Sequence, residues 1–142
     1  MARIKLAFPE KALAQLSIPI RITDINYGNH VGNDSFVSLL HEARMQWLQH
    51  HGFTELAIDG VGLIMSELAI EFKSESFYGD QLDIAIACGE VTRVSFELFY
   101  RINTKRKEGD VLIAIAKTGM ISYDYSAKKV SPLPGSLMAI LS

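Results

Sequence analysis

The chain has 142 residues, a formal net charge of −2 and one cysteine, which suits one domain with its own hydrophobic core. This charge gives no electrostatic reason to expect a nucleic-acid partner, and a lone cysteine cannot form an internal disulfide. No segment approaches the ~20 apolar residues of a membrane span, and the first residues lack the apolar core of a signal peptide. We therefore expect a cytoplasmic protein with no membrane partner and with Cys88 as a buried structural thiol.

The first predicted element is a strand over residues 17–23, S-I-P-I-R-I-T. Its apolar residues alternate strictly, which places Ile18, Ile20 and Ile22 on one face. Because Pro19 has no backbone N–H, the strand is expected at a sheet edge or near its own start.

A polar loop, residues 23–35, precedes a segment with helical periodicity. An apolar stripe recurs at i, i+4, i+7 and i+11. The stripe residues are Phe36, Leu40, Ala43 and Trp47. A side chain among residues 33–35 can cap the first turn, and Gly52 suits a left-handed stop. The sequence predicts a helix over residues 34–51.

The rest of the chain is read as strands, because apolar residues alternate with mostly polar ones. The four predicted strands lie within 68–73, 82–87, 93–102 and 111–123. The last of these is apolar on both faces, which suits cover by a helix or another subunit. Residues 104–110 read as a solvated hairpin tip, and Pro132 and Pro134 are expected to end regular structure.

An amphipathic helix and a mostly antiparallel sheet must bury their apolar faces against each other. We therefore expect an α+β fold in which a sheet of about five strands wraps around one long central helix.

Short motifs follow this order of elements. Residues 21–36 read R-I-T-D-I-N-Y-G-N-H-V-G-N-D-S-F, and H-E-A-R follows at residues 41–44. Y-G-D lies at residues 78–80 and P-L-P at residues 132–134. Together they resemble the hotdog-fold acyl-CoA thioesterases of the 4-hydroxybenzoyl-CoA thioesterase type, whose pattern is close to R-x-x-D-x-D-x-x-x-H-V-N-N-x-x-Y followed by E-A-R.

The resemblance implies one hotdog domain over residues 1–142 that hydrolyses an acyl thioester to the free acid and the thiol. The thiol carrier is coenzyme A or an acyl carrier protein, and no cofactor is implied beyond the coenzyme A of the substrate. It also implies a homodimer or a tetramer of dimers, with the acyl chain in an apolar tunnel at a subunit interface.

Three positions depart from the family pattern. Asn26 stands in place of the second aspartate, Gly32 in place of the first asparagine after the histidine, and Phe36 in place of the tyrosine. In many relatives that aspartate is the general base or the nucleophile, whereas asparagine cannot take a proton at neutral pH. Either catalysis has moved to another residue, or the activity is altered or absent.

Four residues are candidates for the catalytic site. Asn26 can orient a water molecule or donate to a carbonyl. Asp24 is the nearest retained carboxylate and is either the base or a brace for the loop. Histidine is the side chain best suited to exchange a proton near neutral pH, and His30 either serves the substrate or braces the loop. Glu42, on the helix, is a reserve base whose alternative role is a salt bridge or a subunit contact.

The substrate-binding candidates lie around the helix N-terminus: Gly32, Asn33, Asp34 and Phe36. Backbone N–H groups there can polarise a thioester carbonyl. Gly32 either permits close approach of the substrate or relieves a turn. The four histidines show no metal-ligand spacing, so no metal is expected.

Two other functions remain open at this point. The (R)-specific enoyl-CoA hydratases, also hotdog proteins, use D-x-N-P-x-H. Asp24 and Asn26 match its start, but His30 comes one residue late and the proline is absent. A non-catalytic acyl-CoA-binding protein is the third hypothesis, motivated by Asn26.

Overall fold

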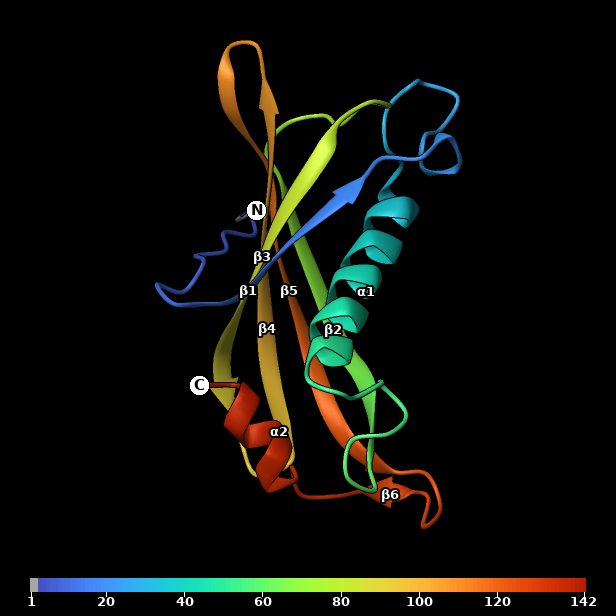
Figure 1. The fold of residues 1–142 in the computed structure, drawn as a ribbon, viewed down its shortest axis with the longest axis vertical. Coiled ribbons are helices and arrows are strands. Elements are labelled where there is room, and N and C mark those ends of the chain that lie inside the picture. Colours follow the sequence, from blue (N-terminus) through green and yellow to red (C-terminus); the bar gives the residue numbers. More distant parts are fainter. Residues whose placement is uncertain (1–2) are drawn as a thin grey trace.

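The computed structural model describes residues 3–142 and shows an antiparallel sheet with one long helix against it (Figure 1). The strand order is β1-β3-β4-β5-β2, and the short β6 pairs with β5. The elements are β1 (Ala12–Pro19), the 3-10 turn η1 (Ile22–Asp24), α1 (Asn33–His50), β2 (Gly62–Phe72), β3 (Gln81–Val91), β4 (Ser95–Arg106), β5 (Gly109–Asp124), β6 (Lys129–Val130) and α2 (Gly135–Ile140). The expected α+β fold, with about five strands around one central helix, is confirmed.

The predicted helix is confirmed with its bounds shifted by one residue at each end. All four stripe residues are at most 3% exposed, so this face packs on the sheet. Gly52 has φ +83° and ends the helix in the left-handed conformation, as predicted. The prediction of a side-chain cap from residues 33–35 is wrong, because these residues lie inside the first turn and the N-cap is Gly32.

The first strand lies at a sheet edge, as Pro19 predicts, but it begins earlier and ends at Pro19. Ile18 and Ile20 are buried as expected, whereas Ile22 lies in η1 and is 64% exposed. Side-chain hydrogen bonds around η1, described with the site, turn the chain out of the extended conformation that strict alternation predicts.

The four later strands are confirmed and are longer than predicted. Their inward-facing residues are almost fully buried; on β3 and β4 these are Leu82, Ile84, Ile86, Phe96, Leu98, Tyr100 and Ile102. Pairing between β4 and β5 continues to Arg106 and Gly109, so the predicted hairpin tip shortens to residues 107–108. Cys88 on β3 is only half-buried, and its Sγ donates to the Gly89 carbonyl at 3.5 Å.

The N-terminal segment flanks the second apolar face of β5, for which the sequence predicts a helix or another subunit. The Leu6 N–H donates to Glu71 Oε1 at 2.9 Å, and the Arg101 guanidinium lies 4.5 Å from the centre of the Phe8 ring. Glu71 and Arg101 are the register neighbours of Ile115 on the two adjoining strands. The N-terminal segment, without regular secondary structure, therefore lies against this part of the sheet.

The prediction that Pro132 and Pro134 end regular structure is wrong, since α2 follows. Pro134 is the N-cap of that helix, where a missing backbone N–H removes no helical hydrogen bond. Leu137 and Leu141, four residues apart, are buried in the main core, so tertiary packing stabilises this short helix.

Candidate functional site

The candidate site lies where η1 leads through a tight turn, residues 26–30, toward α1. The Asn26 N–H donates to the His30 carbonyl at 2.9 Å, and the Asn29 N–H donates to the Asn26 carbonyl at 3.0 Å. Asn29 has φ +65°, a conformation that asparagine adopts more readily than most residues. The Asn26 Oδ1 also accepts from the Gly28 N–H at 2.8 Å. The polar loop is therefore a compact, internally bonded turn.

This turn is attached to the sheet through the segment before β3. His30 forms an isolated β-bridge with Phe77. The Phe77 N–H donates to Asp80 Oδ2 at 2.9 Å, and Arg106 Nη2 pairs with the same oxygen at 2.7 Å. Asp80 of the Y-G-D motif therefore fixes the segment on which the turn rests.

The first turn of α1 leaves backbone donors free. The Phe36 N–H donates to the Gly32 carbonyl at 3.1 Å, which is the first hydrogen bond of the helix. Within residues 3–142, the N–H groups of Asn33, Asp34 and Ser35 have no hydrogen-bond partner. These donors and the positive end of the helix dipole can stabilise negative charge that develops on a bound oxygen.

Gly32 is not required by its backbone conformation, since φ −73° and ψ 158° are accessible to any residue. A Cβ at this position would lie 2.7 Å from Asp34 Oδ1. The absence of a side chain at Gly32 therefore makes room for the Asp34 carboxylate beside the helix N-terminus.

Asp24 is 4% exposed and is engaged by Arg21. Its carboxylate accepts from the Arg21 backbone N–H at 2.8 Å and pairs with the guanidinium at 3.2 Å. Its carbonyl accepts from the Gly32 N–H at 3.3 Å. These contacts correspond to the bracing role that the sequence leaves open for Asp24.

Asn26 and His30 converge over Gly28. A methyl group on Gly28 would lie 3.2 Å from Asn26 Oδ1 and 3.3 Å from His30 Nε2. His30 Nδ1 lies 3.4 Å from the Val31 carbonyl. When Nδ1 carries the ring proton and donates it there, Nε2 keeps a lone pair that can accept a proton.

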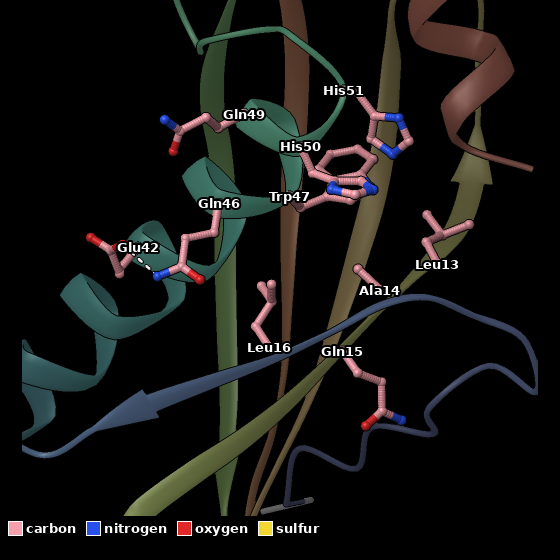
Figure 2. Close-up of a pocket in the computed structure, with 10 residues that line it drawn as sticks. All are labelled: Leu13, Ala14, Gln15, Leu16, Glu42, Gln46, Trp47, Gln49, His50 and His51. Atoms are coloured by element: carbon pink, nitrogen blue, oxygen red, sulfur yellow. Dashed lines mark hydrogen bonds between the residues drawn. The ribbon is translucent and has the colours of Figure 1, made fainter.

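Glu42 is not brought to this turn within the chain. It lies nine residues after Asn33 on α1, about 13 Å along the helix axis, and it accepts from Gln46 Nε2 at 2.8 Å. It lines a cavity of about 640 Å³ between α1 and β1, with Trp47 and His50 (Figure 2). This cavity contains none of the loop candidates.

Phe36 is a core residue in this structure. It is 3% exposed, and its ring packs edge to face on Phe72, with 5.1 Å between ring centres. Direct contact between Phe36 and a substrate is therefore not available, whereas Asn33 and Asp34 are exposed at the helix N-terminus.

Sequence reasoning missed a buried polar cluster behind α1. Arg44 Nη1 donates to the Tyr100 hydroxyl at 3.1 Å, and that oxygen lies 2.7 Å from Thr118 Oγ1. Burial raises the pKa of the Tyr100 hydroxyl. The signal in the sequence is an arginine at i+4 from Leu40, beside the apolar stripe.

No helix within residues 3–142 is long and apolar enough to cross a membrane. Over the same residues, no group of three or more histidine, cysteine, aspartate or glutamate side chains is placed to hold a metal ion.

A family model described as the thioesterase-like superfamily matches residues 20–141. The chain belongs to the thioesterase-like superfamily. Within that superfamily it is similar to the acyl-CoA thioester hydrolase YbgC of Escherichia coli, with 26% identity over 129 residues. The matched region covers 85% of this chain and 91% of YbgC.

Solved structures of this superfamily share the fold. Slr0204, a 1,4-dihydroxy-2-naphthoyl-CoA thioesterase from Synechocystis, gives a TM-score of 0.78 at 19% identity, covering 89% of this chain and 93% of its own. An aspartate-to-asparagine mutant of 4-hydroxybenzoyl-CoA thioesterase, complexed with 4-hydroxybenzoyl-CoA, gives 0.79 at 18% identity, covering 91% and 98%. The expected hotdog fold is thereby confirmed.

Proposed function

We propose that this protein hydrolyses an acyl-CoA thioester, or the same thioester on an acyl carrier protein, at the turn before α1. The observation that carries the proposal is the open N-terminus of α1, whose free N–H groups follow Gly32 and Asn26, with His30 Nε2 beside Gly28 on the same turn. Membership of the thioesterase-like superfamily and the similarity to YbgC support the reaction class.

In the proposed reaction, the thioester carbonyl oxygen accepts hydrogen bonds from the N–H groups of Asn33 and Asp34. These donors stabilise the oxyanion that forms when water attacks the carbonyl carbon. Asn26 orients that water, and His30 Nε2 takes its proton. The carbon–sulfur bond then breaks, and the thiolate leaves as the free thiol once it regains the proton.

The replacement of the family aspartate by Asn26 is compatible with substrate binding. A related 4-hydroxybenzoyl-CoA thioesterase holds its acyl-CoA despite an aspartate-to-asparagine change. Asp24 does not supply the missing base in this proposal, because Arg21 occupies its carboxylate.

The proposed active unit is a homodimer, or a tetramer of such dimers. β2 is the second edge of the sheet and runs for 11 residues. Its apolar side chains Ile64, Met65, Leu68 and Phe72 are exposed in the single chain. Long apolar edge strands are normally covered, and a second copy that pairs along β2 would cover this one and close the acyl tunnel.

We also propose a cytoplasmic location. Cys88 is a free thiol in the structure, and a free thiol suits a reducing compartment. Fractionation of the source cells tests this location.

Thiol release from short, long and aromatic acyl-CoAs tests the reaction. The wild-type protein is expected to release thiol, and His30→Ala should lower kcat by about 100-fold, as loss of a general base does. His50→Ala changes an exposed histidine at the other end of α1 and should leave the rate unchanged. Equal rates for His30→Ala and wild type would contradict the assigned base.

Asn26→Asp reports which residue takes the proton. If His30 is the base, a carboxylate at position 26 should change the rate of thiol release little. A large gain would instead show that the natural protein is a weakened form of an aspartate-dependent thioesterase.

The same substrates separate the other hypotheses. Hydration of crotonyl-CoA without thiol release would indicate the hydratase, and binding of acyl-CoA with neither reaction would indicate a non-catalytic protein.

A further inference from the structure

The surface between α1 and β2, here called the α1–β2 groove, begins beside the N-terminus of α1. There the buried Phe36 packs under Phe72, whose ring is exposed and presents an apolar surface. Farther along, a cavity of about 300 Å³ has walls from both elements, including Val37, Met65 and Leu68. β2 therefore runs antiparallel to α1, and its exposed apolar side chains follow the helix away from its N-terminus.

The far end of this cavity is polar. Arg44 and Glu55 both line it, and His41 stands at its rim. Arg44 is 5% exposed, and Tyr100 holds its Nη1, so the guanidinium has a fixed position. Glu55 Oε1 lies 3.4 Å from Arg44 Nε and 2.7 Å from His41 Nε2.

The hydrogen-bonding capacity of this end is incompletely used. Arg44 Nε and Glu55 Oε1 are buried and, in the described chain, have no hydrogen bond of good geometry. The two charges balance each other, so the end offers one donor group and one acceptor group without excess charge.

This arrangement distinguishes between possible ends of an acyl chain. A methyl group would leave both polar groups without a partner. A carboxylate could accept from Arg44, but it would add a second negative charge beside Glu55 and has no proton to donate to it. A hydroxyl group can accept from Arg44 and donate to Glu55 at the same time.

The position of Arg44 sets the length of chain required. Arg44 follows Asn33 by eleven residues, which is about 16 Å along the helix axis. A short acyl group or a single aromatic ring bound at the helix N-terminus does not reach that far.

We propose that the acyl group of the substrate is a medium-length or long chain with a hydroxyl group near its far end, held between Arg44 and Glu55. This inference rests on the proposed function, because it places the thioester at the N-terminus of α1 and the chain in the α1–β2 groove.

The test compares CoA esters that differ only at the chain end, at octanoyl, decanoyl and dodecanoyl lengths. Each length is used with a methyl, an ω-hydroxyl and an ω-carboxyl end. We expect kcat/KM to be at least about tenfold higher for the ω-hydroxyl ester at the length that reaches Arg44, because sites that hydrogen-bond a substrate hydroxyl discriminate against analogues without it.

Glu55→Met should abolish this preference while hydrolysis of the methyl-ended ester persists. Glu55→Gln keeps an acceptor of similar size and should retain the preference, which separates lost recognition from lost folding. Glu90→Met, an exposed glutamate on β3 outside the groove, should behave as wild type. Thermal denaturation of each variant verifies that it is folded.

Hydrolysis without a hydroxyl preference at any length, or a preference that survives Glu55→Met, would overturn the inference. If no ester is hydrolysed, the proposed function is wrong. The inference is then tested by the Kd values of non-hydrolysable thioether analogues, and it predicts tighter binding of the ω-hydroxyl analogue than of the methyl-ended and ω-carboxyl-ended ones. Equal Kd values, or no binding, would overturn it.

Discussion

At the scale of single residues, Tyr100 shows how an apolar pattern can hide a polar role. It occupies an inward position on β4, as alternation predicts, yet its hydroxyl bonds to Arg44 and Thr118. Tyr100→Phe leaves the buried Arg44 without that acceptor, which should lower the free energy of unfolding by about 1–3 kcal/mol. Urea denaturation measures this change.

Tyr78→Phe is the matched control, because Tyr78 is exposed. Its free energy of unfolding should equal that of the wild type. Equal stability of Tyr100→Phe and wild type would show that the hydroxyl network contributes nothing.

Cys88 gives a second residue-scale prediction. Burial, with a smaller contribution from Glu97, raises the pKa of its thiol above the usual value. Because the thiolate is the reactive form, alkylation by iodoacetamide should be slower in the folded protein than in urea at neutral pH. The rate should rise with pH only above the range of an ordinary thiol, and equal rates in the two states would be inconsistent with this pKa shift.

At the scale of elements, Gly52 ends α1 by its conformation alone. Its φ is +83°, and no atom lies within 4 Å of where a Cβ would be. Gly52→Ala should therefore lower the free energy of unfolding by about 1 kcal/mol through backbone strain. Gly135→Ala is the control: no atom lies near its Cβ position either, and its φ is not positive. It should be neutral or stabilising in thermal denaturation, and equal losses at both glycines would argue against strain as the cause.

The periodic elements could be predicted from the sequence because their burial pattern is local. The apolar stripe of the helix and the alternation on β3 and β4 identify the residues that are buried in the core. The start of β1 and the helix α2 could not, since they depend on partners distant in sequence. The sequence shows that Leu137 is apolar, but only its contacts with the core show that it anchors a helix.

The candidate site was predictable in place but not in detail. The polar loop and the helix N-terminus lie together, as the motif resemblance implies. The bracing of Asp24 and the burial of Phe36 depend on side-chain contacts that no spacing encodes. The Arg44–Glu55 pair joins a helix and a loop with Tyr100 behind it, so its members have no common pattern in the sequence.

At the scale of the whole molecule, the exposed β2 edge leads to a prediction about assembly. Ile64→Lys combined with Leu68→Lys places two charges on this edge and should convert the proposed dimer to a monomer of 15.8 kDa. Sedimentation velocity measures the change. Val130→Lys combined with Met138→Lys charges two exposed apolar residues elsewhere and should leave the proposed dimer intact. A wild-type protein that sediments as a monomer would contradict the proposed assembly.

The most direct test of the central claim is a crystal structure with a non-hydrolysable 2-oxoalkyl-CoA, a thioether that keeps the carbonyl group and has a methylene between it and the sulfur. We expect the carbonyl oxygen within hydrogen-bond distance of the N–H groups of Asn33 and Asp34, with room for one water molecule between His30 Nε2 and the carbonyl carbon. A carbonyl bound elsewhere, such as in the cavity beside Glu42 and Trp47, would contradict it.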